Sequence, residues 1–262
     1  MRKSVFVLIV LFFSNIQFSQ SKEECFANLS IFAEYAKVKN YKAAYQPWLE
    51  LKKQCPDLNS AIYVLGERML KSFIKSSDDT AKLQFQKDLV NLYDEWLQYF
   101  PKSKRGVSEV GKILAIKAQT MLDYKLASDS EIVQIYDDAF KKDPKSFKSP
   151  KGLYNYFKLY FKMYKSDDQD VSLEEVFDKY EELTEKFEYE MGAYTAKLDL
   201  ILKKEENSTP LSSREIRNKK VYEVNMVACN TYLNNLNAII AKESTCENLI
   251  PLYRKNLEEN KT

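Results

Sequence analysis

Apolar residues recur every three or four positions through most of the chain, which is the spacing of one face of an α-helix. The clearest case lies between residues 213 and 243, where the apolar stripe consists of Val221, Val224, Ala228, Tyr232, Leu236 and Ile239. No segment alternates apolar and polar residues in the way that a half-buried strand does. The pattern predicts an all-α fold with a long helix near the C-terminus.

A repeated junction divides the first two thirds of the chain. Pro56, Pro101 and Pro144 follow one another at spacings of 45 and 43 residues. An aromatic residue precedes each proline by eight positions, and these residues are Trp48, Tyr93 and Tyr136. A glycine follows each proline by eight to ten positions. Because helices usually end before a proline, we expect helical hairpins, with turns at Asn40, 76–79, 128–130 and 167–170 and the three aromatics as equivalent core residues.

This arrangement resembles the tetratricopeptide-repeat (TPR) family, whose helix pairs carry W-x2-L-G-x2-Y and then A-x3-F followed by P. The positions that match in the first hairpin are Tyr35, Asn40, Tyr41, Ala44, Trp48 and Pro56. Those that match in the next two are Ile62, Leu65, Gly66, Met69, Leu89, Tyr93, Pro101, Val107, Val110, Gly111, Leu114, Ile132, Tyr136 and Pro144. Met69 and Leu114 lack the family's aromatic ring, and the hairpins are longer than the family's units of about 34 residues.

The resemblance implies tandem hairpins stacked as a right-handed solenoid, whose first helices form an inner groove that binds peptides or helices. At the family's spacing, the groove residues are Phe26, Leu29, Ala33, Lys37, Tyr63, Glu67, Leu70, Lys71, Ser108, Lys112 and Ala115. These side chains are chemically mixed, so they identify no particular type of partner.

The domain organisation follows from these segments. Residues 22–190 form the predicted hairpin array, with a fourth pair of helices at 151–166 and 172–189, the latter opened by a capping box of Ser172 and Glu175. Residues 191–262 form a helical extension that is continuous with the array. Its last helix begins at Cys246 and is either a polar-faced cap or the start of a further hairpin.

The N-terminus has the pattern of a signal peptide over residues 1–21. Arg2 and Lys3 precede an apolar run from Val5 to Phe13, which is about half of the length that spans a bilayer. We therefore expect an exported protein, periplasmic or secreted, with no stable membrane insertion after cleavage. Loss of Arg2 and Lys3 lowers the basic residues from 40 to 38, equal to the 38 acidic ones, and a neutral chain argues against nucleic-acid binding.

Composition narrows the chemistry further. Hydrophobic residues make up 45% of the chain, which is enough for a sizeable core, whereas there are only 5 glycines and 0 histidines. The lack of histidine removes the commonest general base and zinc ligand. We therefore expect a protein that is not an enzyme and has no cofactor and no metal. The acidic residues Asp167, Asp168 and Asp170 lack the spacing of a calcium loop.

Cys25 begins the first helix of its hairpin and Cys55 ends the second, so an antiparallel hairpin brings them to one end. They form either a disulfide, which we expect in an exported protein, or two buried thiols. Cys229 lies within the apolar stripe of the long helix, a position typical of a packed thiol.

The function predicted from these observations is that of a scaffold or adaptor that binds a protein or peptide partner in the bacterial cell envelope. One alternative is a glycan-capturing protein that uses aromatic residues such as Tyr156 and Tyr160, unless a neighbouring helix covers them. The other is a hydrolase that uses paired carboxylates of the acidic segment 172–190.

Overall fold

The structure is a computed structural model that describes residues 22–166 and 171–259. The predicted signal peptide and the predicted turn and acidic loop at 167–170 lie outside the described residues. Most of the described residues are helical, and they contain no strand, only an isolated bridge between Lys102 and Ser108. The predicted all-α fold is confirmed. The chain divides into two compact units, one up to Ile113 and one from Leu114 onward.

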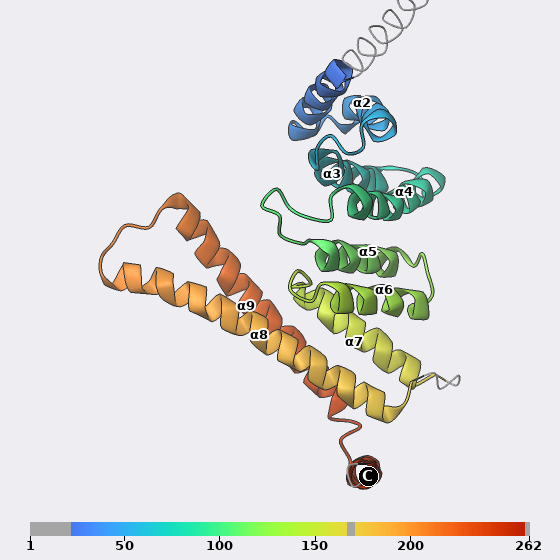
Figure 1. The fold of residues 1–262 in the computed structure, drawn as a ribbon, viewed down its shortest axis with the longest axis vertical. Coiled ribbons are helices and arrows are strands. Elements are labelled where there is room, and N and C mark those ends of the chain that lie inside the picture. The colour runs from blue at the N-terminus through green and yellow to red at the C-terminus, as the bar shows by residue number, and fades with distance from the viewer. Residues whose placement is uncertain (1–21, 167–170, 260–262) are drawn as a thin grey trace, which may run out of the picture. The chain divides into compact units, whose positions relative to one another are not determined.

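The first unit contains a helix over residues 22–37, α2 (Tyr41–Gln54), α3 (Ala61–Ser76) and α4 (Asp79–Tyr99) (Figure 1). The helix 22–37 and α2 form an antiparallel hairpin, because Asn28 donates to Glu50 while Cys25 is joined to Cys55. The disulfide joins Cα atoms 6.2 Å apart. The predicted Cys25–Cys55 bridge is therefore confirmed.

Trp48 is one of the largest fully buried side chains in the core of this unit. Its side chain is 1% exposed, and its Nε1 donates to the carbonyl of Ile62 in α3 over 2.9 Å. A Cβ atom at Gly66 would lie 2.5 Å from that nitrogen, so the close approach of α2 to α3 requires glycine there. Tyr93 of α4 is also buried and donates to Glu67 of α3 over 2.9 Å.

The second unit begins within α5 (Val110–Tyr124) and continues with α6 (Asp129–Lys142), α7 (Pro150–Tyr164), α8 (Leu173–Glu206), α9 (Ser213–Ile240) and α10 (Cys246–Glu259) (Figure 1). α8 is one helix of 34 residues, so it continues past residue 189, where the predicted helix 172–189 was expected to end. Ser172 and Ser212 open α8 and α9 with complete capping boxes, which satisfy backbone amides of the first turn. α10 begins at Cys246 as predicted.

Stacked aromatic rings form the core of α6 and α7. The ring of Tyr136 lies 5.7 Å from that of Phe147 and 5.6 Å from that of Tyr156, and all three side chains are fully buried. The phenol of Tyr136 also donates to Gln119 of α5. Trp48, Tyr93 and Tyr136 are thus all buried core residues, as predicted.

Three of the hairpins close with the same backbone turn. Lys39, Lys125 and Ser208 have φ angles of 61°, 55° and 54°, in the left-handed region. In each turn the next amide donates to the carbonyl five residues earlier, as in Leu126 to Met121 over 3.0 Å. This bond is the mark of a Schellman-type helix end, although glycine is the usual residue at its left-handed position.

Candidate functional site

Part of the predicted groove forms a surface in the first unit. Leu29, Ala33 and Lys37 lie on one face of the helix 22–37 and line a shallow cavity of about 350 Å³ together with residues of α3. Phe26 on the same helix is 51% exposed. The structure therefore brings together Leu29, Ala33 and Lys37, and it leaves Phe26 on the same helix exposed to solvent.

Two groove positions of α3 need correction. Tyr63 and Leu70 are fully buried, and Tyr63 stacks on Trp96 of α4 and donates to the carbonyl of Pro56. Because both side chains are buried, they cannot contact a partner in an open groove, and the family spacing does not hold at these two positions. Glu67 and Lys71 remain partly exposed, but they are joined by an ion pair of 2.7 Å.

The three positions around the start of α5 also differ from the predicted groove. Ala115 is 3% exposed and belongs to the core of the second unit. Ser108 accepts a hydrogen bond from the amide of Val110, and Lys112 pairs with Glu109 over 2.7 Å. Ser108 and Lys112 therefore make contacts at the start of α5, and Ala115 packs in the core.

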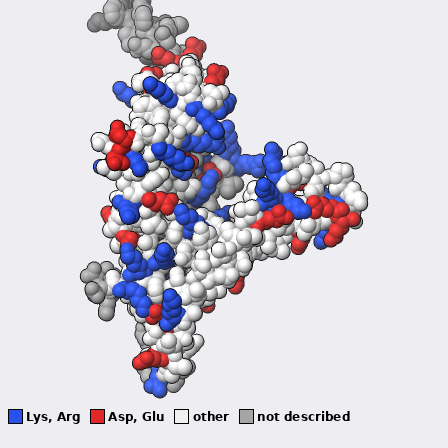
Figure 2. Space-filling model, turned by 180° about the vertical axis from the view of Figure 1, so that it is seen from behind, with Lys and Arg blue, Asp and Glu red and all other residues white. Residues whose placement is uncertain are grey.

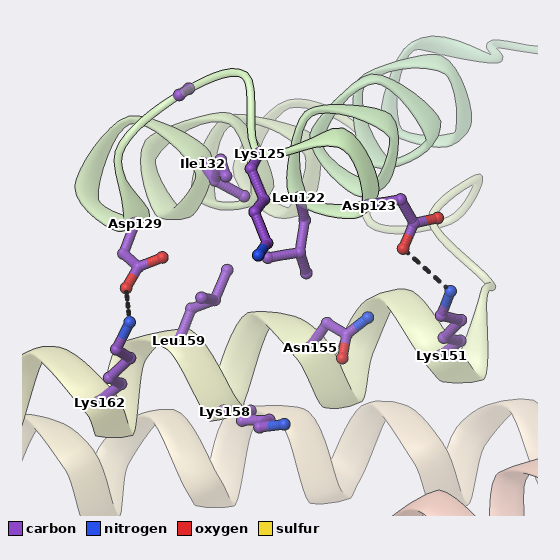
Figure 3. Close-up of a pocket in the computed structure, with 11 residues that line it drawn as sticks. Leu122, Asp123, Lys125, Asp129, Ile132, Lys151, Asn155, Lys158, Leu159 and Lys162 are labelled. Atoms are coloured by element: carbon purple, nitrogen blue, oxygen red, sulfur yellow. Dashed lines mark hydrogen bonds and ion pairs between the residues drawn. The ribbon is translucent and has the colours of Figure 1, made fainter. Parts of the chain in front are cut away.

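A cationic cleft lies between α5, α6 and α7, and no motif in the sequence indicated it. Its volume is about 540 Å³. Figure 3 shows the side chains that line it, and together with Ala127 they are Leu122, Asp123, Lys125, Asp129, Ile132, Lys151, Asn155, Lys158, Leu159 and Lys162. We call this set the α5–α7 cleft.

Two ion pairs bracket the α5–α7 cleft and fix α7 against the two preceding helices. Lys151 pairs with Asp123 over 3.3 Å, and Lys162 pairs with Asp129 over 2.5 Å, as the dashed lines in Figure 3 mark. Asp129 is held at the first residue of α6, behind the capping box of Ser128. The two pairs link α7 to α5 and to α6, but such exposed pairs add little stability.

The interior of the cleft is partly apolar and partly polar. Leu122, Ile132 and Leu159 supply the apolar part. Asn155 donates to the side-chain oxygen of Gln119 over 2.8 Å, and the same oxygen accepts from Tyr136 over 3.1 Å. This network fixes the orientation of the Asn155 amide at the edge of the cleft.

The charge of the cleft is positive, with four lysines against two aspartates. Lys151 and Lys162 are paired, whereas Lys125 and Lys158 form no ion pair with any carboxylate of the described residues. Lys125 sits in the left-handed turn that ends α5 and extends toward α7 (Figure 3). Two unpaired ammonium groups beside an apolar wall suit a ligand that carries both carboxylates and apolar groups.

Burial changes the picture of the aromatic residues proposed for glycan stacking. Tyr156 is fully buried, donates to Asp137 over 2.8 Å and lies under Lys179, whose nitrogen is 5.0 Å from the ring centre. Burial, together with the Asp137 bond, raises the pKa of Tyr156 far above its ordinary value. Tyr156 is thus covered by neighbouring helices and presents no face to a sugar.

The acidic residues at the start of α8 form a shallow cavity without the features of an acid–base pair. Glu175, Asp178 and Glu182 line it beside Tyr160 and Lys179. Hydrogen bonds from the Ser172 backbone and hydroxyl lower the pKa of Glu175, whereas a general acid needs a raised value. Burial opposes the ionisation of Asp137, but bonds from Lys141 and Tyr156 outweigh it and lower its pKa as well.

The other features that could indicate a reactive or metal-binding site are the free thiol of Cys229 and clusters of metal-ligating side chains. Cys229 is buried, and desolvation raises the pKa of its thiol to about 11, which disfavours the reactive thiolate. Over the described part of the chain, no three His, Cys, Asp or Glu side chains gather as metal ligands would. None of the described helices is both long and apolar enough to cross a bilayer. On the face seen in Figure 2, basic and acidic side chains are interspersed.

Comparison with known proteins adds no relative. No protein-family model, no curated protein and no solved structure matches the chain.

Proposed function

We propose that this chain is an exported scaffold or adaptor of the cell envelope, and that the α5–α7 cleft receives an acidic segment of a protein partner. The observation that carries the proposal is that Lys125 and Lys158, which form no ion pair among the described residues, line the same cleft as Leu122 and Leu159. An extended segment that alternates acidic and apolar residues would match both kinds of wall. Helical hairpins commonly hold such segments in the grooves between their helices.

Export is supported by two separate observations. The basic start and apolar run of residues 1–21 favour cleavage after translocation. The Cys25–Cys55 disulfide suits an oxidising compartment. The mass of the protein recovered from the envelope or the medium should match a chain that begins at Lys22, and an uncleaved mass would contradict export by this route.

The binding proposal is tested with a fluorescent peptide that alternates glutamate and leucine, followed by anisotropy. The same peptide with glutamine for glutamate is the probe control. We expect Lys125→Gln with Lys158→Gln to weaken binding about 10-fold, which corresponds to about 1.4 kcal/mol. Added salt should weaken binding of the acidic peptide to the unaltered protein as well, because the attraction is screened.

A matched variant separates the cleft from general charge. Lys145→Gln with Lys148→Gln removes the same charge from exposed positions in the loop between α6 and α7. This variant should bind the acidic peptide as the unaltered protein does. Equal weakening by both double variants, or equal binding of the acidic and amide peptides, would overturn the proposal.

A further inference from the structure

The outward face of α8 is uncovered along the part of the α8–α9 hairpin that we call the arm, residues 185–227. Tyr189 and Leu200 are 63% and 65% exposed there, and Gly192 and Ala196 between them are exposed too. A Cβ atom built at Gly192 would meet nothing within 4 Å. The opposite face of α8 is the buried one, and its residues in the arm are Lys186, Phe187, Glu190, Tyr194, Leu198 and Ile201.

The exposed residues form one line along the helix. Their order is Glu185, Tyr189, Gly192, Ala196, Leu200 and Lys203. The intervals are four, three, four, four and three residues, which keep all six side chains on one face of an α-helix. We call this line the α8 seam, and each of its residues except Leu200 and Tyr189 is small or charged.

The α8 seam is complementary to itself when it is reversed. In an antiparallel pair with a two-fold axis between Gly192 and Ala196, Glu185 of one copy meets Lys203 of the other. Tyr189 meets Leu200 in the same arrangement. The two smallest residues lie at the axis, where they allow the helices to approach closely. Among the described residues neither Glu185 nor Lys203 has an ion-pair partner within the chain.

We propose that the α8 seam is the interface of an antiparallel homodimer, in which a second copy of this chain covers Tyr189 and Leu200. A two-fold interface uses the same patch on both subunits, which is what the reversed order of the α8 seam provides. The seam spans about 27 Å at 1.5 Å per residue. An interface of this length is at the small end of specific protein–protein contacts. The fraction of the chain that is dimeric should therefore depend on the protein concentration.

The test is sedimentation equilibrium of the mature chain over about 1–200 μM, a range suited to weak interfaces. Cys246→Ser serves as the background, because Cys246 is an exposed free thiol that could link two copies covalently. We expect the average mass to rise toward that of a dimer with concentration. A monomer at every concentration would overturn the proposal, and would leave the covering of the seam to a different molecule.

Charge reversal identifies the interface. Glu185→Lys and Lys203→Glu should each weaken dimerisation by about 10-fold or more, because each places like charges opposite one another. The double variant restores both pairs in reversed sense and should dimerise as the background protein does. Because both positions are exposed, circular dichroism should show the fold unchanged. A dimer that is indifferent to the single reversals, or that the double variant fails to restore, would exclude the α8 seam as the interface.

Discussion

The hairpin of residues 22–37 and α2 is short and closed covalently, whereas the hairpin of α8 and α9 is long and closed by polar contacts. The first has the Cys25–Cys55 disulfide at its open end and α3 packed against α2. The second has ion pairs near its turn, including Lys204 with Glu215 over 2.5 Å. Both expose large apolar side chains, such as Val38 at 73% and Val227 at 68%.

The comparison shows what two helices can and cannot do alone. Each helix of a pair buries one stripe against the other and leaves its outer face uncovered unless a third element packs there. In the first hairpin α3 is that third element, and Trp48 reaches it. In the arm no described helix covers Tyr189 or Leu200. The same amphipathic pattern therefore gives a core in one hairpin and an available surface in the other.

The largest expected effect is the loss of Trp48. Trp48→Ala should lower the free energy of unfolding by about 3–5 kcal/mol, because it removes a fully buried ring and its bond to Ile62. Urea unfolding followed by tryptophan fluorescence measures this in the first unit, where Trp96 remains as the probe. Phe26→Ala in the same hairpin is the control and should change stability by about 0.5 kcal/mol or less, since Phe26 is half exposed. Equal costs for the two variants would contradict the comparison.

The disulfide comes next. Cys25→Ala with Cys55→Ala opens a loop with a sequence separation of 30 residues. In the chain-entropy model this change costs about 3–4 kcal/mol, because the unfolded chain regains the freedom that the bridge removed. The same urea titration measures it, and mild reduction of the unaltered protein should reproduce the shift. An unchanged midpoint in both cases would mean that packing alone closes the first hairpin.

Much of this fold could be predicted from local patterns. Trp48, Tyr93 and Tyr136 each precede a proline by eight residues, and all three are buried core residues. This prediction succeeded because the spacing of apolar residues and the prolines that end helices are properties of the individual helices. The groove register could not be transferred in the same way. A family spacing does not specify which side chains a neighbouring helix covers, and Tyr63 is covered because it stacks on Trp96 of α4.

The α5–α7 cleft is a second feature that could not be predicted from the sequence. Its lysines come from the end of α5 and from one face of α7, without a motif or a run of charge. Lys125 lines the cleft from the left-handed position of the turn that ends α5, where glycine is the usual residue. The α8 seam was within reach of the sequence, since its three- and four-residue intervals are legible there. The sequence alone did not show which tyrosine of α8 faces α9. In the structure Tyr194 packs against α9 and Tyr189 is exposed.

A smaller effect is expected at the base of the arm. Glu190 is 1% exposed and accepts from Lys186 over 2.5 Å, so the two charges depend on each other. Glu190→Gln should cost about 2 kcal/mol, because a buried bond between charged groups is replaced by a weaker one. Thermal unfolding followed by circular dichroism measures it. Lys186→Met with Glu190→Leu removes both charges and should be close to neutral, whereas a double variant less stable than Glu190→Gln would contradict this account.

The smallest effect concerns the capping box that opens α9. Bonds from the Lys204 side chain and from the Ser212 hydroxyl and backbone lower the pKa of Glu215 from 4.5 to about 2. Because the folded pKa is the lower one, the stabilisation is fully present above pH 4.5 and is lost as the pH falls toward 2. Ser172 lowers the pKa of Glu175 in the same way at the start of α8, so the capping boxes of α8 and α9 both weaken as the pH falls.

The measurement is the difference in melting temperature between the unaltered protein and Glu215→Gln at several pH values. The introduced glutamine would keep the shape of the capping side chain but carries no charge to titrate, so the difference should narrow as the pH falls from 4.5 toward 2. Glu188→Gln is the control, because it removes a charge from an exposed position of α8 outside any capping box. A difference that stays constant over this range would show that the capping box contributes no charge-dependent stability to the arm. In that case the packing of α8 on α9 in the arm would depend on the buried residues between the two helices, including the stacked rings of Tyr194 and Tyr222, whose centres lie 6.0 Å apart.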